Sequence, residues 1–206
     1  MLVISNLCYG GYFYKYMNAQ YNNPFIWCRV YYDSIYYLMN NWGSVDFKKF
    51  EIRLSDRPNN SYEVLVDNSV KIKYTHYIFD PKAESPIKDM NFDRRLHNYW
   101  IGDIHFKYME KYVFETYTRR VERMLSERED PVFLLRDDEN PKERLSKTNI
   151  QEIADNSKFK TVIITGNKNL STLNKNCKII AIDGILQIHP EIQIRQNLSE
   201  IKSFLL

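Results

Sequence analysis

The sequence has few cysteines, and their spacing assigns them no shared structural role. Cys8, Cys28 and Cys177 form no Cys-x-x-Cys pair and leave an odd thiol over. This pattern disfavours a disulfide framework and a zinc site, and it favours a reducing compartment. No run approaches the roughly 20 apolar residues of a membrane span, and no basic stretch precedes a hydrophobic signal segment. We therefore expect a soluble, cytoplasmic protein without a membrane span.

A charge excess of one sign is also missing, and glycine is scarce. Lys plus Arg number 29 against 26 Asp plus Glu, and the net charge of +3 does not favour a nucleic-acid partner. The six glycines supply neither the spaced glycines of a dinucleotide loop nor the Gly-Lys-Ser of a phosphate loop. These two nucleotide-binding motifs are therefore excluded. The sequence therefore identifies no cofactor. A metal-dependent transferase is not excluded.

Tyrosine, by contrast, is abundant. Sixteen tyrosines occur, and nine of them lie within the first 50 residues. Each ring offers a large apolar face and one hydroxyl, so the cluster suits a core, the interface of a homo-oligomer, or stacking on sugar rings or bases. A core or interface role is favoured, because half-buried tyrosine is ordinary in folded proteins.

Apolar runs and turn residues predict a single α/β domain over residues 1–206. Strands are expected at 2–6, 25–31, 132–135, 160–165 and 178–182. Helices are expected at 10–17, from 32 or 33 to 40, at 107–128 and at 149–156, with Asp33 as a possible N-cap and Thr148 as an N-cap. Unbroken apolar strands on either side of a helix predict parallel pairing of 132–135 with 161–164. The fold class is three-layer α/β with a central, mostly parallel sheet. A small β-rich insertion is expected around 50–79, followed by a charged loop at 80–98.

Polar and reactive residues follow the expected strands. In an open parallel sheet, the ligand crevice lies beyond the carboxyl ends of the strands. The residues expected there are Asn6, Cys8, Arg136, Asp137, Asp138, Thr165, Gly166 and Asn167. Strand-to-loop transitions commonly carry such residues, so the grouping favours a site at this edge without defining its chemistry.

Cys8 falls at the turn between the first strand and the first helix. A helix N-terminus stabilises a thiolate, so we expect the pKa of Cys8 to be lowered. Gly10 and Gly11 would let a substrate approach the backbone and would leave amide donors free, which with Asn6 would stabilise an oxyanion. An inert, buried thiol is the alternative interpretation, and it is the commoner one for cysteine.

A cysteine nucleophile ordinarily needs a histidine and a group that orients it. His105 is the best candidate among the four histidines, since it follows a short apolar element and stands two residues after Asp103. We expect Trp100–Phe106 to be extended or tightly turned, and extended backbone would place both side chains on one face. The alternative is a histidine whose hydrogen bond only holds a turn.

Two charged groups offer further chemistry. The acidic run Asp137–Glu139 follows a strand and could hold a divalent metal, although a solvated turn is the favoured interpretation. Arg119, Arg120 and Arg123 on the long predicted helix could bind a phosphate or anionic sugar, but surface salt bridges explain them more simply.

Several segments together resemble the bacterial family catalogued as domain of unknown function 1919, often labelled exopolysaccharide biosynthesis protein. The segments are Ile4–Gly11, Tyr21–Pro24, Ile101–Phe106 and Tyr117–Arg123, and the Ser-Asn-x-Cys-x-Gly-Gly start is the most specific of them. The resemblance spans about residues 3–165. It implies an α/β fold and a role in surface-polysaccharide synthesis, without an assigned reaction.

The resemblance also points to residues. It implies functional roles for Asn6, Cys8, Gly10, Gly11, Asp103, His105, Arg119, Arg120 and Arg123. Two positions depart from the family pattern. Lys107-Tyr108 stands where members carry a second histidine, and Tyr117 stands where they carry tryptophan.

We therefore predict a surface-polysaccharide biosynthesis protein that transfers or hydrolyses an acyl or other glycan substituent. Cys8 would be the nucleophile, His105 the base, and Asp103 the residue that orients the imidazole. One alternative is a metal-dependent glycosyltransferase that uses Asp137 and Asp138 with a sugar nucleotide. Another is a non-catalytic carbohydrate-binding or assembly protein built on the tyrosine-rich half. A carbohydrate or sugar nucleotide is the expected partner in each case.

Overall fold

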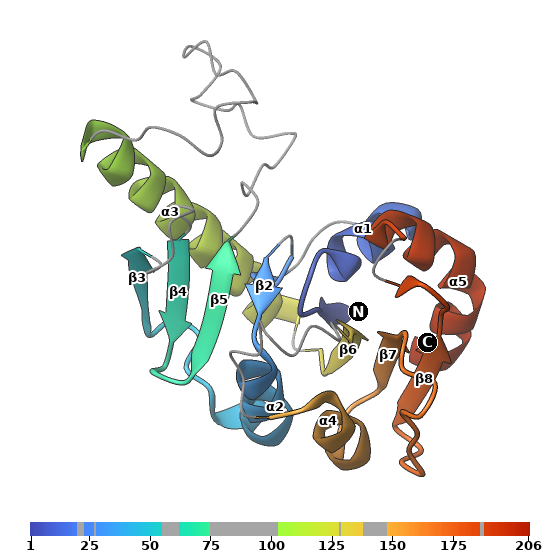
Figure 1. Ribbon diagram of the computed structural model, residues 1–206. Helices are drawn as coiled ribbons and strands as arrows, with labels where there is room; N and C mark the ends of the chain where they lie inside the picture. Colours follow the sequence, from blue (N-terminus) through green and yellow to red (C-terminus); the bar gives the residue numbers. More distant parts are fainter. Residues whose placement is uncertain are drawn as a thin grey trace.

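A central parallel sheet covered by helices on both faces organises the protein (Figure 1). The computed structural model describes residues 1–19, 23–26, 28–54, 62–74, 103–127, 129–137, 148–185 and 188–206, and for Leu54, Tyr62, Tyr74 and 103–112 it describes the backbone alone. The expected loop at 80–98 lies outside the described residues.

The parallel sheet has four strands in the order β1-β6-β7-β8. Their bounds are β1 Leu2–Ile4, β6 Pro131–Arg136, β7 Thr161–Thr165 and β8 Cys177–Ala181. The expected parallel pairing of β6 with β7 is confirmed, with Leu134 opposite Val162. Because β1 also pairs in parallel with β6, the carboxyl ends of β1, β6 and β7 meet at one edge.

Alternate residues of these strands face opposite sides of the sheet. Val3, Leu134, Val162 and Ile164 pack with α1 (Tyr9–Tyr16) and α5 (Pro190–Leu205), whereas Leu2, Ile4, Phe133, Leu135 and Ile163 pack on the other side with α2 (Tyr32–Asn41) and α4 (Ile150–Asn156). Both faces are buried, which is why these strands are continuous apolar runs. The predicted three-layer α/β class is confirmed.

A second, antiparallel sheet has the order β2-β5-β4-β3. Its strands are β2 Arg29–Val30, β3 Phe50–Leu54, β4 Tyr62–Val66 and β5 Val70–Tyr74. The long helix α3 (Asp103–Glu127) packs on it, and the ring of Tyr117 lies 4.4 Å from that of Phe50. The short 3-10 helix η1 (Trp42–Ser44) follows α2. One core cluster includes residues of both sheets, so the β-rich insertion shares the main core.

The structure corrects several local predictions. The expected strand 25–31 is reduced to Arg29–Val30, because residues 24–26 form a turn. Tyr31 rather than Asp33 is the N-cap of α2, and Asn149 rather than Thr148 caps α4 by accepting from the Glu152 amide. Helix α5 was not predicted, although proline at its first position is a typical helix start.

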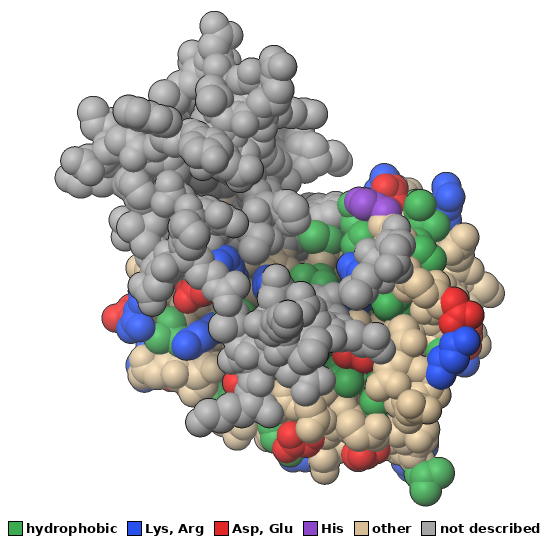
Figure 2. Space-filling view, in the orientation of Figure 1, with side chains coloured by type: hydrophobic (Ala, Val, Ile, Leu, Met, Phe, Trp, Pro, Cys, Tyr) green, Lys and Arg blue, Asp and Glu red, His purple; other side chains and the backbone are tan. Residues whose placement is uncertain are grey.

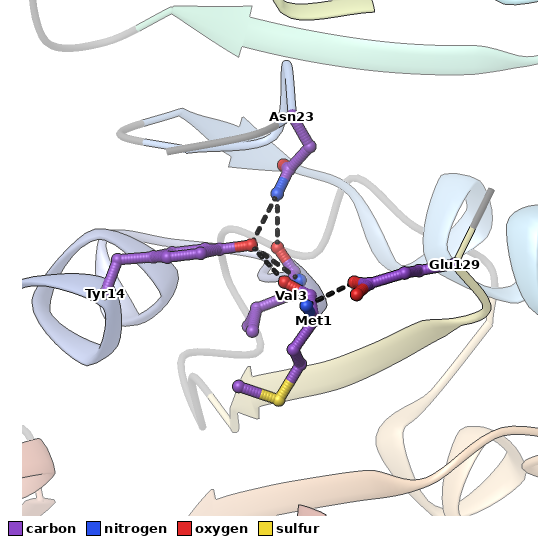
Figure 3. A network of polar contacts seen from close by, with 5 residues as sticks. All are labelled: Met1, Val3, Tyr14, Asn23 and Glu129. Carbon is purple, nitrogen blue, oxygen red and sulfur yellow. Dashed lines mark hydrogen bonds and ion pairs between the residues drawn. The ribbon is translucent and has the colours of Figure 1, made fainter. Parts of the chain in front are cut away.

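Within the described residues, the outer edge of β1 is closed by side chains instead of another strand (Figure 3). The Val3 amide donates to the Tyr14 hydroxyl at 3.1 Å, and the Val3 carbonyl accepts from Asn23 Nδ2 at 3.1 Å. The Tyr14 hydroxyl in turn donates to the Met1 carbonyl, and the Met1 amino group pairs with Glu129. These bonds satisfy edge groups that would otherwise be open to pairing with another chain. Tyr14 is 2% exposed, so the core role predicted for tyrosine holds here.

Candidate functional site

The ends of β1 and β6 are joined by one side chain. Asn6 Oδ1 accepts from the Arg136 amide at 2.9 Å, and Asn6 Nδ2 donates to the Arg136 carbonyl at 2.8 Å. The Tyr32 hydroxyl donates to the same carbonyl at 2.9 Å. Asn6 therefore continues the ladder past the end of β1 and fixes the edge predicted to hold the site. The oxyanion role proposed for Asn6 stays a prediction.

Cys8 lies at the start of α1, as the turn pattern predicts. It is the N-cap residue, its backbone carbonyl accepts from the Tyr12 amide at 3.2 Å, and its side chain is half-buried. Burial raises the pKa of the Cys8 thiol to about 11, although a backbone hydrogen bond and the positive charge of Arg136 act to lower it. The expectation of a lowered pKa is therefore wrong, because desolvation outweighs both opposing effects. The thiol is protonated at neutral pH.

The two glycines after Cys8 serve packing. Gly10 and Gly11 are both buried in α1. A Cβ built on Gly10 would lie 3.1 Å from Ile26 Cδ1 and 3.2 Å from Ser5 Cβ. Gly10 thus lets α1 approach the segment after β1 closely, which accounts for its presence without a bound substrate. The expected use of Gly10 and Gly11 for substrate approach has no support from their buried positions.

At the same edge, but on the opposite face of the sheet, Asp137 and Thr165 form a buried polar pair. The Thr165 hydroxyl donates to Asp137 Oδ2 at 2.7 Å and accepts from the Asn167 amide at 2.8 Å. Asp137 is 3% exposed and Thr165 is fully buried. The prediction of a solvated turn is therefore wrong for Asp137. Asp138 lies outside the described residues, and among those described no three His, Cys, Asp or Glu residues are grouped to hold a metal.

The sequence interpretation missed a contact between the starts of α1 and α5. Tyr12, one turn after Cys8, packs edge-on against the ring of His189, with centroids 5.6 Å apart. His189 is the N-cap of α5, where its Nδ1 accepts from the Glu191 amide at 3.3 Å. Glu191 also pairs with Lys15 at 2.6 Å and accepts from the Tyr16 hydroxyl. In the sequence, the only signal was Pro190 directly after His189, because proline is common at the first position of a helix.

The backbone conformation at Asp103 and His105 differs from the one expected. Helix α3 begins at Asp103, so the prediction of an extended or turned segment is wrong for residues 103–106, and residues 100–102 lie outside the described part of the chain. Positions two apart in a helix differ by about 200° around the axis, and the reason for placing both residues on one face no longer applies. Both side chains lie outside the described residues. The pairing of His105 with Cys8 stays a prediction.

The three arginines of α3 have different environments. Arg119 is exposed and Arg123 is half-buried, whereas Arg120 is only 4% exposed and donates to the Ile26 carbonyl at 3.2 Å. Arg120 therefore helps to fix the turn before β2, and the surface interpretation is wrong for this residue. Its charge also acts on Cys28, although burial raises the pKa of that thiol far more strongly.

No family model and no curated protein matches the chain.

Within the described residues, none of the helices combines the length and apolar character needed to span a bilayer. Side chains of both charge signs are interspersed over the described part of the face in Figure 2, in keeping with the nearly balanced composition.

Proposed function

We propose that the chain is a surface-polysaccharide biosynthesis protein that modifies a carbohydrate precursor through a covalent intermediate on Cys8. The observation that carries the proposal is the position of Cys8 at the start of α1, at the carboxyl edge of a parallel sheet. Open α/β sheets bind ligands at this edge. The resemblance of residues 4–11 to the exopolysaccharide family supplies the biological setting.

The proposed reaction is a transfer of an acyl substituent in two steps. Cys8 Sγ attacks the acyl carbon as its proton passes to the base, and the bond to the leaving group breaks with return of that proton to the leaving group. A sugar hydroxyl then attacks the thioester, gives its proton to the base, and releases the thiol with its proton restored. Water in place of the sugar hydroxyl gives hydrolysis.

The raised pKa of Cys8 makes a base necessary for this chemistry. A thiol that is protonated at neutral pH becomes a good nucleophile only if the proton leaves as the sulfur attacks. His105 is the proposed base, and its imidazole must then come within hydrogen-bond reach of Cys8 when the substrate is bound.

The test is complementation of a deletion strain of the host organism. We expect the deletion to lower the amount of surface polysaccharide or its acyl content. Wild-type protein and the control Cys177→Ala should restore it, whereas Cys8→Ser and His105→Asn should not. The matching test in solution uses acetyl-coenzyme A as the probe and looks for an acetylated Cys8 peptide by mass spectrometry. An unchanged polysaccharide in the deletion strain, or full restoration by Cys8→Ser, would refute the proposal.

Asp137 supports a second candidate, a metal-dependent glycosyltransferase. Asp137 places a carboxyl group at the ends of β6 and β7, the edge at which open α/β sheets bind ligands, and carboxylate oxygens are ligands that Mg²⁺ and Mn²⁺ prefer. This candidate requires that a sugar nucleotide binds only with Mg²⁺ or Mn²⁺. Binding measured by calorimetry should then disappear in Asp137→Asn, and metal-independent binding would rule the candidate out.

A further inference from the structure

The chain after β1 and the chain that leads into β2 contact each other at two points. At the first, the Val30 amide donates to the Asn6 carbonyl at 3.1 Å. At the second, Gly10 lies against the side chain of Ile26, since a Cβ built on Gly10 would be 3.1 Å from Ile26 Cδ1. Two short stretches of backbone therefore connect the same pair of contacts.

Each of these stretches, residues 6–10 and 26–30, carries a cysteine at its midpoint. Cys8 and Cys28 each stand two residues from both contacts, and two residues of backbone span at most about 7 Å. The fold thus holds the two cysteines in one small region near the end of β1. A negative charge on Cys8 acts to raise the pKa of Cys28, in agreement with this proximity.

The two thiols differ in their access to solvent. Cys8 is half-buried, whereas Cys28 is 1% exposed and donates weakly to the Pro24 carbonyl at 3.9 Å. A reagent from solution can therefore reach Cys8 first. Cys28 can react only with a group that is already attached to Cys8, so the order of any reaction between them is fixed.

The third thiol lies in another part of the parallel sheet. Cys177 is the first residue of β8, at the amino end of that strand and three strands away from β1. Neighbouring strands are about 4.8 Å apart, so three steps already amount to about 14 Å. A disulfide needs Cα atoms within about 7 Å. In the folded chain, Cys8 can therefore pair with Cys28 but not with Cys177.

We infer that Cys8 and Cys28 form a reversible disulfide, which removes the Cys8 thiol from reaction when the surrounding thiols become oxidised. A disulfide that includes a solvent-accessible sulfur can be reduced again by thiols in solution. The disulfide itself does not depend on the proposed function. Its effect on activity rests on that function, because it blocks the proposed nucleophile.

The oxidant is a small disulfide such as glutathione disulfide. Cys8 Sγ attacks one of its sulfur atoms, the sulfur–sulfur bond breaks, and the Cys8 proton goes to the departing glutathione. Cys28 Sγ then attacks the Cys8 sulfur and displaces the second glutathione, which takes the Cys28 proton. Two protein thiols are oxidised and one glutathione disulfide is reduced to two thiols. The reverse sequence restores Cys8.

The test places the Cys177→Ala chain, which keeps only this pair of thiols, in buffers with fixed ratios of glutathione disulfide to glutathione. Equilibrium is approached from both the reduced and the oxidised chain, so slow exchange does not affect the result. The equilibrium constant for disulfide formation should be about 10- to 100-fold larger in the folded chain than in the same chain unfolded in urea, because the fold already holds the two cysteines together. Mass spectrometry after acid quenching measures it.

Peptide mapping of the wild type identifies the pair independently, and it remains informative if Cys177→Ala is unfolded. Trypsin cleaves after Lys15 and Arg29, so the disulfide should join residues 1–15 to residues 16–29. A disulfide of the folded protein that includes Cys177 instead would contradict the inference.

Two single variants, each combined with Cys177→Ala, test the order of the steps. Cys28→Ala should stop with one glutathione attached to Cys8. Folded Cys8→Ser should take up no glutathione, because Cys28 is out of reach of the solvent. An equilibrium constant no larger in the folded chain than in the unfolded one would overturn the inference. Accumulation of glutathione on Cys8 without a disulfide, when Cys28 is present, would also overturn it.

Activity is measured as acetylation of Cys8 by acetyl-coenzyme A. Acetylation should be lost in the oxidised chain and should return after reduction with dithiothreitol. The two proposals fail in different ways. Disulfide formation without any acetylation of reduced Cys8 would refute the covalent proposal alone, and acetylation without disulfide formation would refute the present inference alone.

Discussion

The two faces of the parallel sheet carry opposite chemistry at the same edge. On the α1/α5 face lie Arg136, the half-buried thiol of Cys8, and His189. On the α2/α4 face lie Asp137 and Thr165, a carboxylate and a hydroxyl that are bonded to each other and buried. The last residue of β6, Arg136, and the residue that follows it, Asp137, thus place a cation on one face and a carboxylate on the other.

This separation follows from the period of two in an extended strand. Leu134 and Arg136 belong to the α1/α5 face, and Leu135 and Asp137 to the other. A shift of one residue in register would exchange the two sets, so the buried pattern of β6 also fixes which chemistry each face offers. The cysteine proposal needs only the first face, and the metal-dependent proposal needs only the second. Each can therefore be tested without disturbing the other.

The largest expected effect is the pH dependence of Cys8 alkylation. Below a pKa of about 11 the thiolate fraction rises tenfold per pH unit, so the rate should increase about 100-fold from pH 7.5 to 9.5 without levelling off. Labelling by iodoacetamide, followed by peptide mass spectrometry, measures this. Burial raises the pKa of Cys177 to about 12, so Cys177 provides the internal control and should react more slowly. A plateau for Cys8 below pH 9 would show a stabilised thiolate and would contradict the burial argument.

On the opposite face, Thr165→Val should lower the free energy of unfolding by about 2–3 kcal/mol. The substitution keeps the shape but removes the donor to Asp137 and the acceptor for the Asn167 amide, and hydrogen bonds to charged groups are the stronger kind. Urea denaturation measures the change.

The matched control is Thr118→Val in α3. The Thr118 hydroxyl oxygen is buried and has no hydrogen-bond partner within the described part of the chain. Valine should therefore be neutral there, within about 0.5 kcal/mol, or slightly stabilising. Equal effects at both positions would mean that the Asp137–Thr165 pair does not hold the second face together.

The sequence predicts the sheet well because its signal is local. The apolar runs in β6 and β7 and the helix between them were enough to predict parallel pairing, and with it the edge where Asn6, Arg136 and Thr165 meet. The first turn of α3 was predicted wrongly, because Asp103–Phe106 are helical where an extended or turned segment was expected. A short apolar element of this kind fits a strand or a helix equally well. Propensity could not decide between them.

The chemistry of the site was less predictable, because it depends on contacts between distant residues. Nothing near Cys8 in the sequence shows that its thiol would be desolvated, or that Arg136 would bond to Ile185. The contact of Tyr12 with His189 likewise joins opposite ends of the chain. Sequence patterns identified the residue types at the sheet edge, and tertiary packing set their pKa values and partners.

The smallest effect is expected for Gly10→Ala, which tests whether Gly10 is needed for helix packing or for the approach of a substrate. A methyl group there would press on Ile26 and Ser5, so Gly10→Ala should cost about 1–2 kcal/mol after the better helix propensity of alanine is included. Gly43 in η1 is the control: a Cβ there meets nothing within 4 Å, so Gly43→Ala should be neutral or stabilising by up to about 1 kcal/mol. Urea denaturation compares the free energies of unfolding of the two variants.

If Gly10→Ala is as stable as Gly43→Ala yet fails to restore the surface polysaccharide, the glycine serves the substrate and the packing explanation is wrong. If it is destabilised and the remaining folded protein still restores the polysaccharide, Gly10 acts only by letting α1 reach the sheet and hold Cys8 at its edge.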